Sequence, residues 1–196
     1  MNKAAELTLL ATALAAVAGC FNEPEPAYKS VPAESRVYLS DRGLKALPEV
    51  NAKADYLNLD RNELTNVDAV AALTGLKWLR LNDNRLAALP DLSGLKGLRR
   101  IYLKNNRFTE VPETLKDLPA LTDVELSGNP IKEIPEWLAQ KRGLVNLSFN
   151  RTGLTALPAD LSAWVSLKSL QLGDLNLPPE EMARIRKALP GTAVAY

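Results

Sequence analysis

The sequence lacks histidine altogether, and it has one cysteine and few aromatic residues. Its 196 residues include no His, a single Cys, and only 6% Phe, Trp and Tyr. Without histidine the chain cannot form a Ser-His-Asp triad, a Cys-His pair or a histidine-based metal site. One cysteine cannot form a disulfide within the chain. We therefore expect no metal, no cofactor and no catalytic triad.

The chain also lacks an excess of charge of either sign. It has 24 Lys and Arg against 23 Asp and Glu, which gives a formal net charge of +1. No field of one sign attracts nucleic acid, so nucleic acid is not an expected partner. Hydrophobic residues make up 46% of the chain and charged residues 24%, which is typical of a single globular domain.

Long hydrophobic runs are missing too. A mostly apolar stretch of 13 residues, Leu7 to Gly19, follows Lys3 near the N-terminus. A transmembrane helix needs about 20 apolar residues, so this stretch is too short to span a bilayer. A basic start followed by a short apolar stretch is typical of a secretory signal peptide.

The end of this stretch, Val17-Ala18-Gly19-Cys20, resembles the lipobox of bacterial lipoproteins. The resemblance implies that residues 1–19 are a lipoprotein signal peptide and that Cys20 becomes the lipidated first residue. Several acyl chains, such as palmitate, would anchor the protein stably to a membrane. Phe21 resembles the residue after cysteine in lipoproteins sent to the outer membrane, so we expect a location in the bacterial cell envelope, at the outer membrane. The alternative is a non-lipidated signal peptide with an incidental cysteine.

A segment rich in proline and glutamate follows the cysteine. Residues 20–35 contain three prolines and three glutamates and show no apolar periodicity: Pro24, Pro26, Pro32, Glu23, Glu25 and Glu34. Such a composition favours an extended spacer over a packed core. At about 3.1 Å per residue, 15 residues would hold a domain some 45 Å from the lipid. We interpret 20–35 as a tether.

From Arg36 to the C-terminus an aliphatic pattern returns seven times, with a period of 20 to 23 residues. Each unit contains two inward aliphatic or aromatic positions: Val37/Leu39, Leu57/Leu59, Leu79/Leu81, Ile101/Leu103, Val124/Leu126, Leu147/Phe149 and Leu170/Leu172. The residue three positions later is polar in the first six units and leucine in the last: Arg42, Asn62, Asn84, Asn106, Asn129, Thr152 and Leu175. The pattern resembles the LxxLxLxxNxL motif of leucine-rich repeats. The resemblance implies an α/β solenoid in which short parallel strands line a concave face and short helical or 3₁₀ returns form the convex face.

The polar column and the C-terminus predict how this solenoid is held and closed. An asparagine amide at a turn can donate to and accept from backbone groups that the sheet does not reach, which is the structural role expected of Asn62, Asn84, Asn106 and Asn129. Residues 180–188 read as a helix and 192–196 as a last strand that covers the sheet edge. We therefore assign 36–196 to one domain of about seven repeats plus a cap.

The outward strand positions form the candidate binding site. Tyr, Trp and Arg are enriched among interface hot spots, and they gather in the first four units. The candidate binding residues are Tyr38, Tyr56, Trp78, Arg80, Arg100, Tyr102, Lys104, Asp123 and Glu125. The alternative is that these large side chains only pack on one another and on arginine stems. Trp137 and Trp164 fall on the returns, where packing is the expected role.

These features favour non-catalytic recognition of a protein or peptide by a monomer that touches a membrane only through its lipid. A second hypothesis is binding of a glycan, such as peptidoglycan or a surface polysaccharide. In it Trp78 and the tyrosines stack on sugars, and Asn58, Asp60 and Asn82 bond the hydroxyls. Asp123 and Glu125 could form a catalytic carboxylate pair, but on an open sheet they lack a dry site. We therefore do not expect an enzyme.

Overall fold

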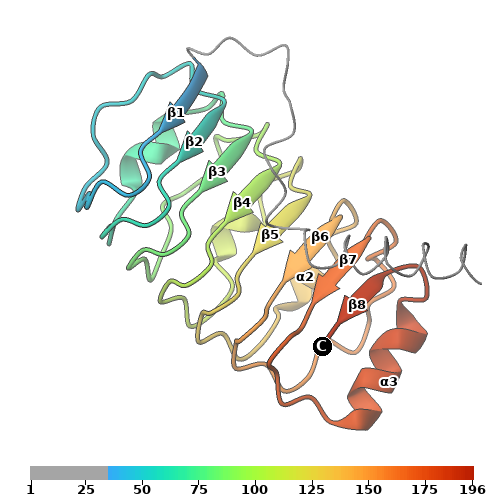
Figure 1. Ribbon diagram of the computed structural model, residues 1–196. Coiled ribbons are helices and arrows are strands. Elements are labelled where there is room, and N and C mark those ends of the chain that lie inside the picture. The colour runs from blue at the N-terminus through green and yellow to red at the C-terminus, as the bar shows by residue number, and fades with distance from the viewer. Residues whose placement is uncertain (1–34) are drawn as a thin grey trace, which may run out of the picture.

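The structure is a computed structural model that describes residues 35–196 (Figure 1). The predicted signal peptide, Cys20 and nearly all of the predicted tether lie outside the described residues. Among residues 35–196 there is no helix with the length and apolar character needed to cross a bilayer.

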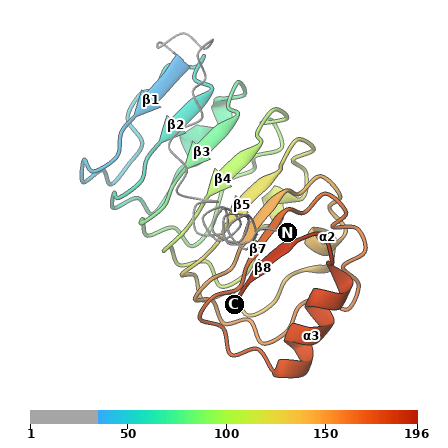
Figure 2. The same ribbon diagram turned by 45° about the vertical axis from the view of Figure 1, so that its right-hand side comes forward.

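The chain forms one parallel sheet of eight short strands in sequential order (Figures 1 and 2). Each strand has three residues: β1 (Arg36–Tyr38), β2 (Tyr56–Asn58), β3 (Trp78–Arg80), β4 (Arg100–Tyr102), β5 (Asp123–Glu125), β6 (Asn146–Ser148), β7 (Ser169–Gln171) and β8 (Ala193–Ala195). The first seven strands coincide with the seven predicted repeat units. This arrangement confirms the predicted solenoid with its curved parallel sheet.

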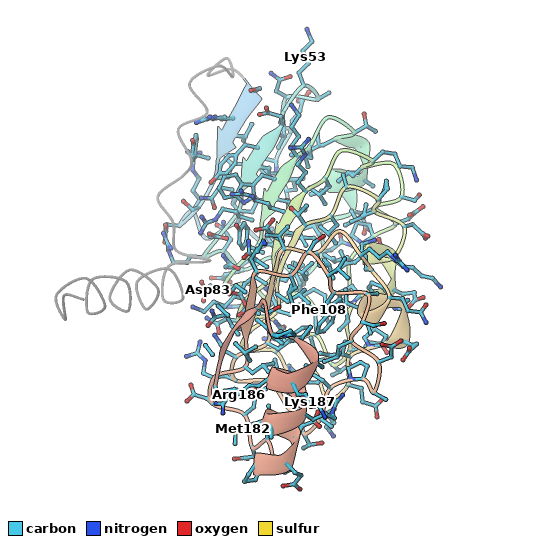
Figure 3. All side chains as sticks on the ribbon, turned by 90° about the vertical axis from the view of Figure 1, so that its right-hand side faces the viewer. Lys53, Asp83, Phe108, Met182, Arg186 and Lys187 are labelled. Carbon is cyan, nitrogen blue, oxygen red and sulfur yellow. The ribbon has the colours of Figure 1, made fainter. Side chains whose placement is uncertain are left out.

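The central residue of each strand points into the solenoid because side chains alternate across a strand. Leu57, Leu79 and Ile101 pair in register and are fully buried. The returns supply the facing layer, for example Leu92, Leu95 and Leu98 in one coil. Phe108, which is labelled in Figure 3, is buried in the same continuous core.

The returns opposite the sheet are short and mostly irregular. Three of them contain a brief helix: η2 (Asp68–Ala72, 3₁₀), η3 (Glu113–Leu115, 3₁₀) and α2 (Glu136–Ala139). Proline precedes η3 and α2, because its fixed φ suits the start of a helical turn. Trp164 is buried on this side and donates from Nε1 to the Leu138 carbonyl at 2.9 Å, so it packs between coils as expected.

Asparagines hold the turn after each inner strand. The Asn106 amide donates to the carbonyls of Leu81, Leu103 and Lys104, and its Oδ1 accepts from the Leu86 amide. Asn62, Asn84 and Asn129 make the equivalent bonds after β2, β3 and β5. Each side chain thus joins its own coil to the coil before it. In the sixth unit Thr152 replaces asparagine and bonds only to the Phe149 carbonyl.

The residue before each of these positions has a left-handed backbone. Six such residues are not glycine, and their φ values lie between 52° and 59°: Asp41, Arg61, Asp83, Asn105, Arg151 and Asp174. Gly128 occupies the same place in the fifth unit with φ of 68°. A Cβ at Gly128 would collide with the Asn105 side chain, so glycine is required there by crowding as well as by conformation.

A helix and a final strand close the C-terminal end. Helix α3 (Pro179–Ala188) has acidic residues in its first turn and basic residues in its last, which complements the helix dipole. Strand β8 pairs with β7 and covers that sheet edge. Glu181 and Arg184 tie the helix to the last return, since Glu181 accepts from the Leu157 amide and Arg184 donates to the Leu157 carbonyl. The helix and strand that the sequence predicts are therefore present.

Replacing Asn106 with alanine should lower the free energy of unfolding by about 2–4 kcal/mol, because it leaves buried carbonyls and an amide without partners. Urea unfolding followed by circular dichroism measures the change. Asn105→Gly is the matched control, since it removes an amide from the adjacent, more exposed position and suits a positive φ. A loss as small for Asn106→Ala as for the control would contradict the role given to this side chain.

Candidate recognition surface on the strand face

Four aromatic rings form a continuous row on the outward face of strands β1 to β4, and we call Tyr38, Tyr56, Trp78 and Tyr102 the aromatic strip. Ring centroids are 5.2 Å apart between Tyr38 and Tyr56, and 5.1 Å apart between Tyr56 and Trp78. Trp78 and Tyr102 follow at 5.8 Å. The strand register pairs Tyr56 with Trp78 directly, and Tyr38 and Tyr102 lie diagonally to them on the neighbouring strands.

Two arginines lie against the strip. The Arg100 guanidinium lies 4.9 Å from the Trp78 ring, and that of Arg80 lies 5.4 Å from the Tyr102 ring. Arg80 also pairs with Asp60 at 2.7 Å, whereas Arg100 is 3.8 Å from Asp123. Stacking and ion pairing hold both guanidinium groups in place, which lowers the entropy that a ligand contact would otherwise cost.

Most of the strip is more deeply buried than an open binding patch predicts. Tyr56, Trp78 and Tyr102 expose only 5%, 7% and 4% of their surface, whereas Tyr38 exposes 45%. Burial raises the pKa of Tyr102 to about 12, and the nearby Asp123 charge acts in the same direction. The burial of Tyr56, Trp78 and Tyr102 therefore agrees with the alternative that these side chains mainly pack on one another. Among the rings, Tyr38 offers the most accessible surface.

The carboxylates of β5 are buried as well. Asp123 exposes 5% and Glu125 exposes 4%, so the expectation that both stand on open surface is wrong. Asp123 accepts from Asn146 Nδ2 at 2.6 Å, and Glu125 accepts from the Ser127 amide at 2.7 Å. Burial raises the pKa of Glu125, and its hydrogen bonds to Ser127 oppose the shift. The two side chains are thus bonded to neighbouring residues and do not converge on a shared substrate site.

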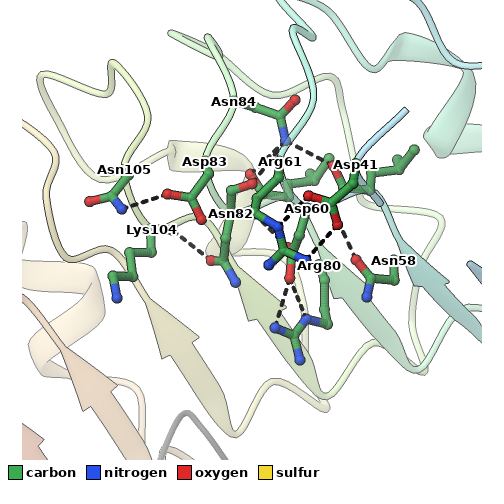
Figure 4. A network of polar contacts seen from close by, with 12 residues as sticks. Asp41, Asn58, Asp60, Arg61, Arg80, Asn82, Asp83, Asn84, Lys104 and Asn105 are labelled. Atoms are coloured by element: carbon green, nitrogen blue, oxygen red, sulfur yellow. Dashed lines mark hydrogen bonds and ion pairs between the residues drawn. The ribbon is translucent and has the colours of Figure 1, made fainter. Parts of the chain in front are cut away.

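A second hydrogen-bonded ladder runs along the outer end of the strands, and the sequence analysis missed it. Asp60 accepts from the Asn82 amide, Asn82 accepts from the Lys104 amide, and Asn150 accepts from the Gly173 amide. These residues share one column, and each bonds the backbone of the next coil. Figure 4 shows the part of this ladder that contains Asp60, Asn82 and Lys104. In the sequence this ladder corresponds to short polar residues that recur two positions before the asparagine column, such as Asp60 and Asn82.

The ladder changes partners where its column holds a lysine. Lys104 has no acceptor in its side chain, so the Ser127 amide bonds to Glu125 instead. Ser127 then resumes the pattern, because its hydroxyl accepts from the Asn150 amide. Glu125 therefore replaces the acceptor that the side chain at position 104 lacks, and Lys104 itself is half-buried.

The same ladder bears on the glycan hypothesis. Asn58 accepts from the Asp60 amide, and Asp60 accepts from both the Asn82 amide and Arg80. The polar groups proposed to bind sugar hydroxyls are thus already bonded inside the chain. In the described part of the chain there is also no group of three or more Cys, Asp or Glu arranged to hold a metal ion.

Comparisons with known proteins identify this architecture as a leucine-rich repeat solenoid. A family profile described as Leucine rich repeat matches residues 74–131. A leucine-rich repeat protein of Leptospira interrogans has a TM-score of 0.53 and 24% identity, over 83% of this chain and 55% of that one. YopM from Yersinia enterocolitica has a TM-score of 0.59 and 29% identity, over 85% of this chain and 33% of that one. This chain therefore spans about half and one third of the lengths of these two proteins. No curated protein sequence matches it.

Leucine-rich repeat solenoids commonly bind proteins through the extended concave surface that their coils create. In this chain that surface is the strand face, which carries the aromatic strip and its two stacked arginines.

Replacing Glu125 with glutamine should stabilise the fold at neutral pH. The raised pKa means that the carboxyl group of Glu125 binds its proton more tightly in the folded state than in the unfolded state. The free energy of unfolding therefore falls as the pH rises from the pKa of the unfolded state through that of the folded state. Glutamine keeps an acceptor for the Ser127 amide without the charge. Urea unfolding from pH 4 to pH 8 should show the variant more stable than wild type near pH 7, with the difference vanishing in acid.

Glu133→Gln is the control, because Glu133 is exposed on a return and should show little difference at any pH. A stability difference for Glu125→Gln that does not change with pH would contradict the electrostatic explanation.

Proposed function

We propose that this chain is a non-catalytic recognition protein that binds a protein or peptide through its strand face. The observation that carries the proposal is the row of four rings with two arginines fixed against it, on a fold that commonly binds proteins. Aromatic and arginine side chains of this kind are the usual anchors of protein interfaces. Rigid coils on both sides hold the anchors in one geometry, which favours affinity by preorganisation.

We favour a protein ligand over a glycan because the polar groups near the strip are engaged within the chain. A sugar site needs several hydrogen-bonding groups that are free to meet hydroxyls. Asn58 instead accepts from an amide of its own coil, and Asp60 and Asn82 accept from amides of the next coil. Tyr38, Arg80 and Arg100 retain accessible surface, and these types suit a peptide. Bonding of Asp123 and Glu125 to their neighbours supports a binding role over a catalytic one.

We also propose that the recognition domain is displayed on the bacterial cell envelope by a lipid on Cys20. The support is the sequence alone: a basic start, a short apolar stretch, the lipobox-like Val17-Ala18-Gly19-Cys20 and the proline-rich segment that follows. The lipid would be the only contact with a membrane, with the outer membrane as the destination. Several acyl chains provide stable attachment where one does not.

A photoreactive amino acid placed at position 38 should crosslink to the ligand in intact envelopes, because Tyr38 is the most exposed ring of the strip. Placed at position 165, which is 74% exposed on a return, the same group should give no such adduct. Arg100→Ala should weaken binding of the identified ligand about tenfold, as for a moderate interface anchor. Equal adducts at both positions would contradict recognition by the strand face, and an adduct with glycan would replace the protein hypothesis.

Cys20→Ser should release the protein from membranes, because the thiol is the predicted site of lipid attachment. Fractionation of cells that express each form, with mass spectrometry of the N-terminal peptide, measures the change. Wild type should carry acyl chains and sediment with membranes, whereas the variant should be soluble and keep residues 1–19 or be cut elsewhere. Membrane association that persists in the variant would remove the lipid-anchor proposal.

A further inference from the structure

The residue types on the strand face change from one end of the sheet to the other. In the two columns formed by the first and third residues of the strands, all positions on β1 to β4 except Asn58 hold arginine or aromatic residues, and acidic residues occur only on β5. Beyond β5 the same columns hold Asn, Ser and Gln, and then Ala on β8. A ligand that crosses the strands therefore meets rings first and carboxylates second.

One buried polar group on this face points to a ligand that supplies an acceptor. Trp78 is 93% shielded, yet no described residue accepts a hydrogen bond from its Nε1. A buried indole donor normally has a partner, and its loss costs free energy. Trp78 stands on β3 in the middle of the aromatic strip, where a ligand with free backbone carbonyls would satisfy it. Extended proline-containing segments present such carbonyls and favour aromatic-lined surfaces.

We propose that the aromatic strip and the acidic strand β5 form the docking site of the chain's own proline-rich segment, residues 21–34. The described chain begins at Ser35, directly before β1, so the attachment point fixes the register of that segment on the face. This inference goes beyond the proposed function, because it requires no external partner.

Distances along the segment match the spacing of the strands. Strand β3 lies about 9.6 Å from β1, and β5 lies about 19 Å from it, at roughly 4.8 Å per strand. Pro32 is three residues before Ser35, which is about 9.3 Å in an extended polyproline conformation. Lys29 is six residues before Ser35, or about 18.6 Å away. Proline thus reaches Trp78, and the lysine reaches β5.

The charges also correspond in register. Lys29 is the only basic residue among residues 21–34, and β5 is the only strand with carboxylates in the two columns. No ion pair joins Glu125 to a basic residue within 35–196, and the Arg100 partner of Asp123 is 3.8 Å away. Lys29 is therefore placed to pair with Asp123, whose ion-pair contact within residues 35–196 is the more distant Arg100.

Disulfide trapping tests the docking in the full chain carrying Cys20→Ser, which has no other cysteine. Ser30→Cys with Arg100→Cys places one thiol next to Lys29 and the other on β4, and leaves Pro32, Trp78, Lys29 and Asp123 intact. The control pair is Ser30→Cys with Ser169→Cys, which moves the second thiol to β7 in the same column. Since thiols separated by more than one strand spacing cannot bridge without movement, the first pair should close about tenfold faster under mild oxidation.

Two substitutions make the test specific to the proposed contacts. Lys29→Glu should abolish the preference for the first pair, whereas Lys53→Glu, on an exposed loop, should leave it unchanged. In the chain carrying only Cys20→Ser, the indole N–H signal of Trp78, assigned with Trp78→Phe, should shift on Pro32→Ser. The docking would be overturned if both cysteine pairs closed at the same rate, or if disulfides formed only between two molecules. It would also be overturned if the preference survived Lys29→Glu and the indole signal did not shift on Pro32→Ser.

The outcome is separable from the proposed function. Trapping is measured on purified chain without any ligand, whereas recognition is measured by crosslinking from position 38. Loss of the trapping preference with retained crosslinking would overturn the docking and leave recognition standing.

Discussion

The structure depends on satisfying the backbone polar groups that the sheet does not reach. Each coil leaves its strand through a tight turn with a left-handed residue, and the carbonyls at that turn point into the solenoid. Four asparagines, Asn62, Asn84, Asn106 and Asn129, bond these carbonyls within and between coils. Buried peptide groups without partners would cost several kcal/mol in total, so the leucine core can close only because these amides are present.

The same requirement shapes the surface. On the outer end of the strands, side chains at Asp60, Asn82, Ser127 and Asn150 accept bonds from the next coil and so are not available to a ligand. What remains for recognition are the larger residues that reach beyond this ladder. Arg80 shows both roles, since it pairs with Asp60 of the ladder and stacks on Tyr102 of the strip. The proposed recognition therefore rests on few positions of a face that is mainly structural.

Regular spacing made most of the fold predictable from the sequence. The inward leucines, the asparagine column and the C-terminal helix and strand all follow from positions that recur or break a period, and each has a local physical reason. Burial on the strand face could not be predicted this way. Whether Trp78 or Glu125 is accessible depends on the sizes of neighbours in adjacent coils, and those neighbours differ from unit to unit. The bond from the Ser127 amide to Glu125 is an example. It follows from the sequence only if each side chain of the outer column is considered as a hydrogen-bond acceptor, a role that Lys104 cannot fill.

The bonds between neighbouring coils also limit how the strand face can move. The coils of β2, β3 and β4 are bonded to one another through the sheet, the asparagines and the outer column, so none of these strands can shift without disturbing three sets of bonds. The strip consequently holds its rings in one arrangement, and a partner must fit that arrangement rather than induce it. The two ends of the sheet differ in this respect. Strand β1 is only half-buried, whereas α3 and β8 cover the C-terminal end. Adaptation to a partner is therefore concentrated at the β1 end, where Tyr38 is exposed and the described chain begins.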